Sequence, residues 1–250
     1  KIGLYGGTGL NASAQIGHGG VAMRAPMSGS VTVESGSGGV ELSGGSGTRT
    51  YAMIGNGGYN IDNQIDGDVT VTAKGTAATD GIVMGGGSGS YSGAFLGNGI
   101  YQNTADVSGF TKVSVINGGL TMDGGTASYS RVGIGHTNDT DSNTMTGYVD
   151  VDVRQGDITV TGGLGQYASA TIGHVSRGGT ATSSGDVTVV AGDGDITLKG
   201  GSGTLSTAFA VARIGHGMWE SGNKTGVITV TAEKGDILVQ GGEGNTTIST

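Results

Sequence analysis

A three-residue pattern, Ile or Leu followed by Gly and then His or Asn, recurs six times along the chain. The copies are Ile16–His18, Ile54–Asn56, Leu96–Asn98, Ile134–His136, Ile172–His174 and Ile214–His216. Each follows the one before it after a step of about 38 residues or of about 42 residues, a near-constant period typical of proteins built from stacked repeats. A Gly-Gly pair precedes each of the first five copies at a fixed spacing and the sixth at a slightly wider one. The repeat therefore decides the expected fold.

Each repeat also contains three short segments in which apolar residues alternate with polar or small ones. The first set is Val31/Val33, Val69/Val71, Val113/Val115, Val151/Val153, Val187/Val189 and Ile228/Val230. The second set is Ile2/Leu4, Val40/Leu42, Ile82/Met84, Leu120/Met122, Ile158/Val160, Ile196/Leu198 and Ile237/Val239. The third set is Ala14/Ile16, Ala52/Ile54, Ala94/Leu96, Val132/Ile134, Ala170/Ile172 and Ala212/Ile214. A period of two predicts strands with one buried face, whereas a helix needs a period of 3.6.

The predicted fold is an all-β, right-handed parallel β-helix (β-solenoid), a single segment over residues 1–250 with about six repeats. Because one repeat divides evenly into two shorter coils, we favour two coils per repeat and a rod of roughly 60 Å. The rival arrangement is one large coil per repeat with a long loop, which gives roughly 30 Å. Neither end of the chain coincides with a polar cap, so we expect a fragment of a longer fibre or end-to-end self-association.

The segment that follows each triplet differs in sequence from repeat to repeat. These segments are 19–30, 57–68, 99–112, 137–150, 175–186 and 217–226, and the last contains Trp219, the only tryptophan. A coil tolerates insertion at its rim, so we expect these variable segments to form rim loops.

Composition excludes several classes of protein. The chain has 56 glycines and one proline, and so much glycine predicts many tight corners. A net charge of −8 with scattered basic residues argues against nucleic-acid binding and against docking on anionic lipid. No apolar run is long enough for membrane insertion as a spanning helix. Without any cysteine, disulfides and thiolate metal sites are not available.

The histidines of the triplets are the most obvious candidates for metal binding. His18, His136, His174 and His216 share their repeat position with Asn56 and Asn98. A metal site needs ligands that converge on one ion, whereas a row along the axis spaces them apart. Asparagine in the same position favours a polar corner residue that hydrogen-bonds the backbone of the turn or its neighbours.

Other candidate sites also favour structural interpretations. Asp139–Asn143 begins like a calcium loop but lacks the required glycine and glutamate. The Gly-Gly-x-Gly corners, such as Gly44–Gly47, lack the aspartate of calcium-binding repeats. The recurring carboxylates precede strands at turn positions, where aspartate is a natural turn former; they are Asp68, Asp157, Asp186, Asp195 and Asp236. We therefore expect no catalytic residue, no bound metal and no cofactor.

A row of outward threonines raises the alternative of an ice-binding surface, which needs a flat and regular array of hydroxyls. The first strands carry Thr32, Thr70, Thr188 and Thr229 between their apolar residues. Ser114 and Asp152 are expected to interrupt this row. The corresponding row of the second strands is broken by Glu41, Val83 and Leu238. Exposed threonine is more simply explained as a good strand former.

The repeats resemble those of a known family over essentially the whole chain. Gly185–Val189 followed by Gly194–Leu198 and then Gly200–Gly203 resembles repeats of large filamentous-haemagglutinin-like bacterial adhesins. Ile16–Gly20 is similar to a repeat in the stalks of such proteins. The resemblance implies a β-helix exported by two-partner or autotransporter secretion, located outside a Gram-negative cell or on its outer membrane. It also implies adhesion to host cells or to biofilm polysaccharide. The alternatives are a polysaccharide-cleaving β-helix enzyme, an ice-binding solenoid, or a spacer that binds nothing.

Overall fold

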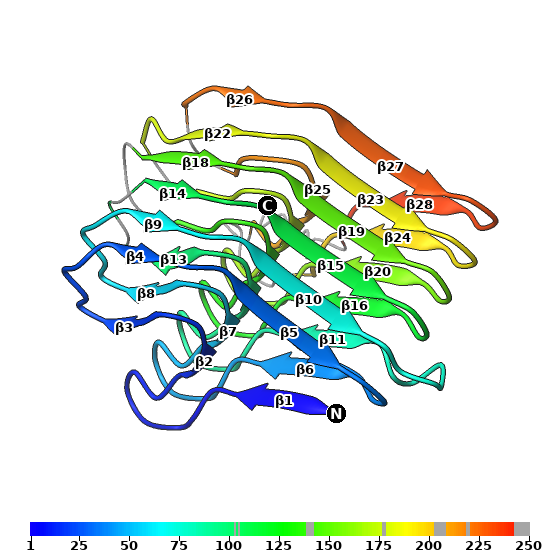
Figure 1. Ribbon diagram of the computed structural model, residues 1–250, viewed down its shortest axis with the longest axis horizontal. Coiled ribbons are helices and arrows are strands. Elements are labelled where there is room, and N and C mark those ends of the chain that lie inside the picture. The colour runs from blue at the N-terminus through cyan, green and yellow to red at the C-terminus, as the bar shows by residue number, and fades with distance from the viewer. Residues whose placement is uncertain are drawn as a thin grey trace, which may run out of the picture.

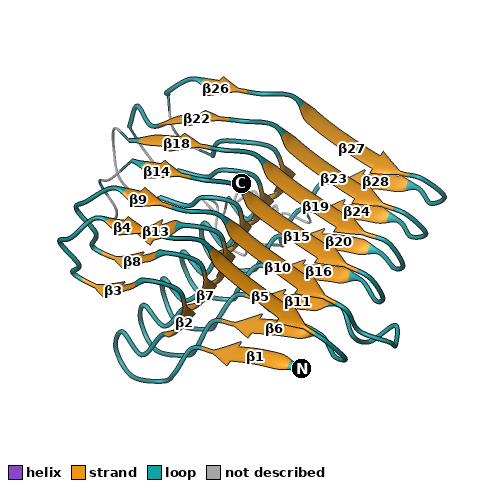
Figure 2. Cartoon of the chain, viewed as in Figure 1, coloured by secondary structure: helices purple, strands orange, loops and turns teal. Residues whose placement is uncertain are grey.

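The computed structural model describes residues 1–102, 104, 106–138, 143–176, 179–202, 209–218 and 221–242. These residues form 28 strands and no helix, and the strands assemble into five parallel sheets, here named A to E (Figures 1 and 2). The predicted all-β solenoid is confirmed. In the part of the chain covered by these ranges, there is no helix long and apolar enough to cross a membrane.

Three of the sheets contain the alternating segments. Sheet A holds β1 (Ile2–Tyr5), β6 (Val40–Ser43), β11 (Ile82–Gly85), β16 (Leu120–Asp123), β20 (Ile158–Thr161), β24 (Ile196–Lys199) and β28 (Ile237–Gln240). Sheet B holds β2 (Ala14–Ile16), β7 (Ala52–Ile54), β12 (Ala94–Leu96), β17 (Val132–Ile134), β21 (Ala170–Ile172) and β25 (Ala212–Ile214). Sheet E holds β5 (Val31–Ser35), β10 (Val69–Ala73), β15 (Thr111–Val115), β19 (Val149–Val153), β23 (Val187–Ala191) and β27 (Ile228–Ala232).

The other two sheets come from the variable segments. Sheet C holds β3 (Gly19–Val21), β8 (Gly57–Tyr59) and β13 (Gly99–Tyr101). Sheet D holds β4 (Met27–Ser28), β9 (Ile65–Asp66), β14 (Val107–Ser108), β18 (Thr144–Thr146), β22 (Thr182–Ser184) and β26 (Lys224–Thr225). The expectation that these segments are rim loops is therefore wrong, because their short strands pair from coil to coil. Trp219 lies outside the described residues.

Each repeat makes one coil, so the expectation of two coils per repeat is also wrong. Ile2 pairs with Val40 in sheet A, and Ala14 pairs with Ala52 in sheet B, so each residue lies next to its counterpart in the following repeat. The chain passes once through sheets A, B, D and E before it returns to sheet A, and in the first three coils it also passes through sheet C between sheets B and D (Figure 1). Strands in neighbouring coils are about 4.8 Å apart, so the stack is about 30 Å long. The variable segment completes the same coil instead of forming a second one.

The register of sheet E corrects the alignment of two repeats. Val113 pairs with Val71 and not with Val69, and Thr111 occupies the inward position next to Val69. Val151 pairs with Val113 in the next coil. The first-strand segments of these two repeats therefore begin two residues earlier than the alternation predicts. The pairings of the second and third strands are those that the sequence predicts.

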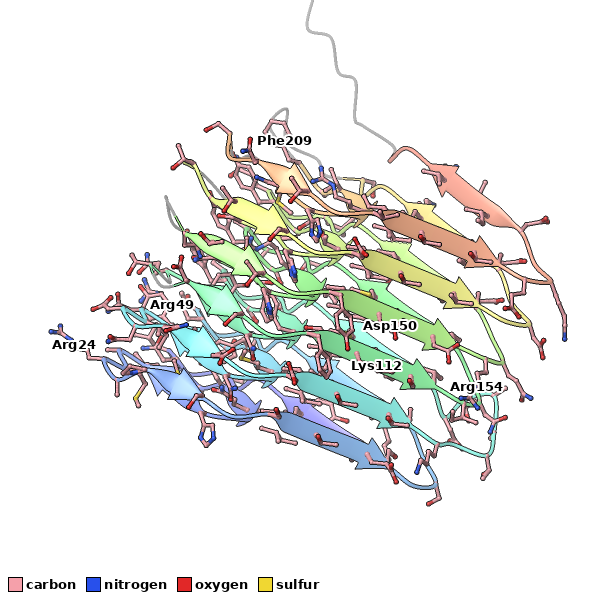
Figure 3. All side chains as sticks on the ribbon, turned by 45° about the horizontal axis from the view of Figure 1, so that its top comes forward. Arg24, Arg49, Lys112, Asp150, Arg154 and Phe209 are labelled. Atoms are coloured by element: carbon pink, nitrogen blue, oxygen red, sulfur yellow. The ribbon has the colours of Figure 1, made fainter. Side chains whose placement is uncertain are left out.

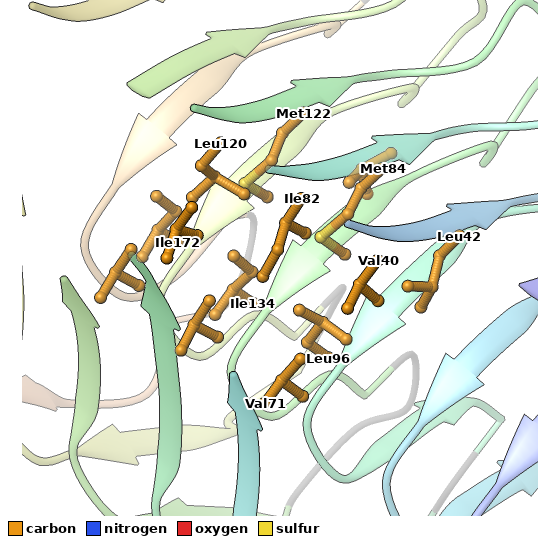
Figure 4. Packing of buried hydrophobic residues seen from close by; sticks show 14 of the residues in the cluster. Val40, Leu42, Val71, Ile82, Met84, Leu96, Leu120, Met122, Ile134 and Ile172 are labelled. Carbon is orange, nitrogen blue, oxygen red and sulfur yellow. The ribbon is translucent and has the colours of Figure 1, made fainter. Parts of the chain in front are cut away.

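The main core lies between sheets A, B and E. Figure 4 shows how Val40, Ile82 and Leu120 of sheet A meet Leu96 and Ile134 of sheet B across this space. Inward residues of successive coils stack in rows, and most of them are fully buried. We call this part of the molecule the three-walled core. Because residues of similar shape stack in most of these rows, a single alternating pattern repeated in the sequence is enough to fill the core.

Two smaller clusters pack beside the three-walled core. Residues of the variable segments form the first, which consists of Met27, Ile61, Ile65, Val107 and Met145. Sheets C and D with this cluster are called the side lobe. The second cluster covers the outer face of sheet B, where Met53 and Phe95 pack with Tyr51 and Tyr101. Sheet B is consequently buried on both faces in β7 and β12.

Candidate functional site

The third residue of each triplet forms a continuous ladder along the axis. We call the series His18, Asn56, Asn98, His136, His174 and His216 the corner ladder. In each coil the backbone N–H of this residue donates to the side chain of its counterpart in the next coil. The acceptor is Oδ1 of asparagine or Nδ1 of histidine, at distances of 2.9, 2.9, 3.4, 3.0 and 3.1 Å along the series.

The glycine of the triplet makes this ladder possible. Gly55 has a φ of 144°, which side-chain-bearing residues rarely adopt. A Cβ on Gly55 would lie 1.9 Å from the carbonyl oxygen of Gly97 in the next coil. Only glycine therefore allows the coils to approach closely enough at this corner for the neighbouring side chain to meet the backbone.

In the second to sixth coils, the far end of the ladder side chain crosses to the opposite corner of the preceding coil, between sheets D and E. Asn98 Nδ2 donates to the carbonyl oxygen of Gly67 at 2.6 Å, and His136 Nε2 lies 2.8 Å from that of Gly109. Asn56, His174 and His216 make the same contact with the equivalent glycine carbonyls. The corner ladder thus joins both sides of the neck between the three-walled core and the side lobe.

These contacts define the protonation state of the buried histidines. Nδ1 accepts a hydrogen bond from a backbone N–H and Nε2 donates one to a carbonyl, which is the neutral tautomer. Burial lowers the pKa of His136 to about 4, against the opposing effect of its carbonyl partners. Burial also lowers the pKa of His174 well below its ordinary value, and neighbouring His136 adds to this effect. The ring centroids of His136 and His174 are 4.6 Å apart in a stacked arrangement. Two protonated, positively charged rings would repel each other at this distance.

Metal binding at the corner ladder would require its hydrogen bonds to break. In His136 and His174 both ring nitrogens already have backbone partners. Among the residues that the structure describes, no group of three or more His, Asp or Glu side chains is placed to hold an ion. The interpretation of these residues as polar corner residues is confirmed by their hydrogen bonds.

Recurring aspartates make a second set of links between coils. Asp157 Oδ1 accepts the backbone N–H of Asp195 at 2.9 Å, and Asp195 Oδ1 accepts that of Asp236 at 2.8 Å. Asp68 and Asp186 accept backbone N–H groups of the following coil in the same way. The turn interpretation of these four carboxylates is confirmed, with the addition that each one bonds to the next coil.

Residues 139–142 of the calcium-like sequence lie outside the described residues. At the Gly44–Gly47 corner, Thr50 Oγ1 donates to the Gly47 carbonyl at 2.8 Å, and Gly45 N–H donates to the Thr50 carbonyl at 2.8 Å. This corner is therefore closed by its own hydrogen bonds.

An aromatic ladder at the corner between sheets A and B was missed by the sequence analysis. Tyr91 stacks on Tyr129 at 4.6 Å, Tyr129 stacks on Tyr167 at 4.9 Å, and Tyr167 stacks on Phe209 at 5.6 Å. The three tyrosines have φ values of 57° to 60°. Their recurrence at the same position of successive repeats is the signal that would have revealed the ladder. Stacking thus links coils at the surface as hydrogen bonds do inside.

The outward row of sheet E differs from the one expected. Its members in register are Thr32, Thr70, Lys112, Asp150, Thr188 and Thr229. Lys112 Nζ lies 3.2 Å from Asp150 Oδ2, and Figure 3 shows the two side chains together on this face. An ion pair rather than Ser114 and Asp152 interrupts the threonines. A charged pair in mid-row breaks the regular hydroxyl array that an ice-binding face needs.

The fold and its ladders define the class of the protein as a parallel β-solenoid. Comparison with known proteins returns no matching family, no similar curated protein and no similar solved structure.

Proposed function

We propose that this chain is a structural stalk or adhesive segment of a secreted or cell-surface bacterial adhesin or biofilm-matrix fibre. It attaches cells to one another, to surfaces or to extracellular polysaccharide. The proposed location is outside the cell or on the outer-membrane surface of a Gram-negative bacterium, as the resemblance of Gly185–Gly203 implies. Host-cell or matrix glycans are the proposed partners, and the chain is not proposed to be an enzyme.

The corner ladder is the observation that carries this proposal. Catalysis needs acid, base or nucleophilic groups that converge in a cleft and are available to a substrate. Here His136 and His174 are hydrogen-bonded at both ring nitrogens, and Asp157 and Asp195 each bond to the next coil. Side chains of these types are used to hold coils together, which favours a mechanical function over a chemical one.

The stacking also fits a stalk. Every pair of neighbouring coils is linked by parallel strands in sheets A, B and E, with the corner ladder between them. Hydrogen bonds between coils run along the axis, so a pull along the axis loads many of them at once. Stability in such a stack is the sum of contacts between neighbours, and length can therefore grow without a change of design.

Incubation of the purified protein with neutral and acidic polysaccharides tests the proposal. New reducing ends and retained protein are both measured, with a known polysaccharide-cleaving β-helix enzyme as the positive control. We expect retention without cleavage. Release of new reducing ends would contradict the proposal and favour an enzyme. If neither cleavage nor retention is observed, the chain is a spacer without adhesive function.

A further inference from the structure

One turn between sheets E and A is longer than its counterparts. Residues 74–81 join β10 to β11, whereas four residues make this turn in the other described coils, as between β15 and β16. This insertion accounts for the greater length of one of the two longer repeats. In Figure 1 the loop projects beyond the shorter turns on either side. An insertion at one corner of a regular coil is a common place for a binding surface.

The long loop is held in place by its own hydrogen bonds. Asp80 Oδ2 accepts the backbone N–H groups of Thr76 and Ala77, both at 2.9 Å. Asn117 in the next coil donates from Nδ2 to the carbonyl oxygen of Gly75 at 2.5 Å. The loop is therefore tied to the neighbouring turn, and the space beside it is preformed.

A pocket of about 460 Å³ lies between this loop and the turns of the next two coils. Its volume falls within the range of small-molecule sites, about 300–1,000 Å³. Thr76 and Ala78 form one side, and the turns that carry Asn117 and Gln155 form the other. Gly118 and Gly156 line it with φ values of 85° and 121°, so bare backbone is required there. Larger residues at these positions would strain the turns and clash with the backbone of the preceding turn or loop.

The lining groups restrict the chemistry of a ligand. Thr76 contributes a hydroxyl, Gln155 contributes an amide and Asp157 contributes a carboxylate. Oδ1 of Asp157 already accepts a hydrogen bond from the backbone N–H of Asp195. A hydroxyl-rich ligand both donates and accepts hydrogen bonds, which suits a hydroxyl and an amide that do both and a carboxylate that only accepts. The described residues that line the pocket include no lysine or arginine, so an anion would meet Asp157 without a compensating charge. A single carboxylate is too little to hold Ca²⁺, which takes six to eight oxygens.

We infer that the pocket between the long loop and the two following turns binds a neutral sugar residue of a polysaccharide. This inference rests on the proposed adhesive function and assigns its glycan contact to one corner of one coil. Gln155 and Asp157 hydrogen-bond the sugar hydroxyls, and Thr76 closes the pocket from the loop side. Because the loop occurs once among the described turns of this corner, the affinity comes from one site and not from a repeated surface.

The neighbouring coil supplies the variant that tests this inference. Residues 74–81 are replaced with the four residues Ile116–Gly119, so that the turn takes the short form of its neighbour. Gln155→Ala serves as a second variant that leaves the backbone unchanged. Asp193→Ala is the matched control, because Asp193 occupies the same turn position as Gln155 one coil beyond the pocket. Thermal melting and circular dichroism check that each variant is folded.

Saturation-transfer NMR and calorimetry are run with neutral and uronate oligosaccharides. We expect the neutral series to bind, with affinity falling at least about tenfold in the loop replacement and in Gln155→Ala but not in Asp193→Ala. Unchanged neutral binding in both test variants would overturn the site while leaving the adhesive function intact. Preference for uronates would overturn the assigned ligand class. Absence of any glycan binding by the native chain would overturn the site and the adhesive function together.

Discussion

The three-walled core and the side lobe belong to the same coils, but they follow different rules. In the three-walled core, most inward positions carry a similar aliphatic residue from coil to coil, as in the row Ile54, Leu96, Ile134 and Ile172. In the side lobe the strands of sheet D are only two or three residues long, and the buried cluster mixes methionine, isoleucine and valine. Sequence repetition therefore marks the part of the coil whose inward side chains must stack in rows.

The corner ladder stands at the boundary between the two regions. Its side chains span from the end of sheet B to the glycines that precede sheet E. Asparagine and histidine both occur in this position because each presents an acceptor and a donor at suitable distances. Only the histidines can take up a proton, so one part of the ladder is sensitive to pH and the other part is not.

The largest expected effect compares Ile54→Ala in the three-walled core with Ile65→Ala in the side lobe. Both side chains are fully buried in the native protein. Ile54 lies between rows of residues that three sheets hold in place, so the cavity left by alanine cannot collapse. We therefore expect the free energy of unfolding to fall by about 4 kcal/mol. Ile65 lies in a two-residue strand that can relax, and about 2 kcal/mol is expected. Urea titration measures both, and equal losses would contradict the distinction between the regions.

Acid is expected to weaken the histidine part of the ladder. The pKa of His136 is lowered to about 4, so the unfolded chain binds the proton first as the pH falls. Stability from this residue is fully present above about pH 6.5 and is lost between about pH 6.5 and 4, by about 3 kcal/mol. His174 acts in the same direction.

Conversion of both residues to asparagine isolates this effect. His136→Asn with His174→Asn copies Asn56 and Asn98, so the ladder is kept without these titrating groups. We expect a flatter dependence of the urea midpoint on pH in this variant than in the native chain. Parallel curves for the two proteins would show that the buried histidines do not couple folding to protonation.

A smaller effect on stability is expected when the hydrogen bonds of the neck are removed at His136. His136→Ala leaves the buried N–H of Asn98 and the carbonyl of Gly109 without their partner. We expect it to be less stable than His136→Asn by about 2 kcal/mol at neutral pH. The difference is measured by urea titration of the two variants side by side. If alanine and asparagine are equivalent, the ladder does not stabilise the neck.

The smallest effect is expected on the outer face of sheet E. Lys112→Thr removes the exposed ion pair with Asp150 and extends the threonine row from Thr70 into the next coil. Exposed pairs contribute little, so stability should change by less than about 0.5 kcal/mol. A loss of several kcal/mol in thermal or urea unfolding would mean that the surface, and not the core, determines the stability of the coil.

The sequence predicts the three-walled core better than the side lobe for a physical reason. Segments such as Val40/Leu42 and Ala52/Ile54 alternate over a whole strand, and this pattern reports burial directly. Met27 and Ile65 sit in strands too short to show any period. The sequence therefore predicts loops in place of the side lobe and two coils per repeat in place of one.

The candidate sites divide in the same way. That His136 and Asn98 share a repeat position was enough to predict a polar corner residue. The carbonyl that each contacts could not be predicted, because Gly67 and Gly109 come from the far side of the neck. The pocket beside residues 74–81 likewise depends on turns from three coils, which only the register brings together.

The claim that each repeat forms one coil is tested most directly by a single distance. Thr32 and Thr229 are exposed members of the same outward row of sheet E, at its two ends. The chain has no cysteine, so Thr32→Cys with Thr229→Cys gives two unique sites for spin labels. One coil per repeat places the labelled positions five strand spacings apart, at about 24 Å, by pulsed electron paramagnetic resonance. A distance of about 48 Å would mean two coils per repeat and would contradict the account.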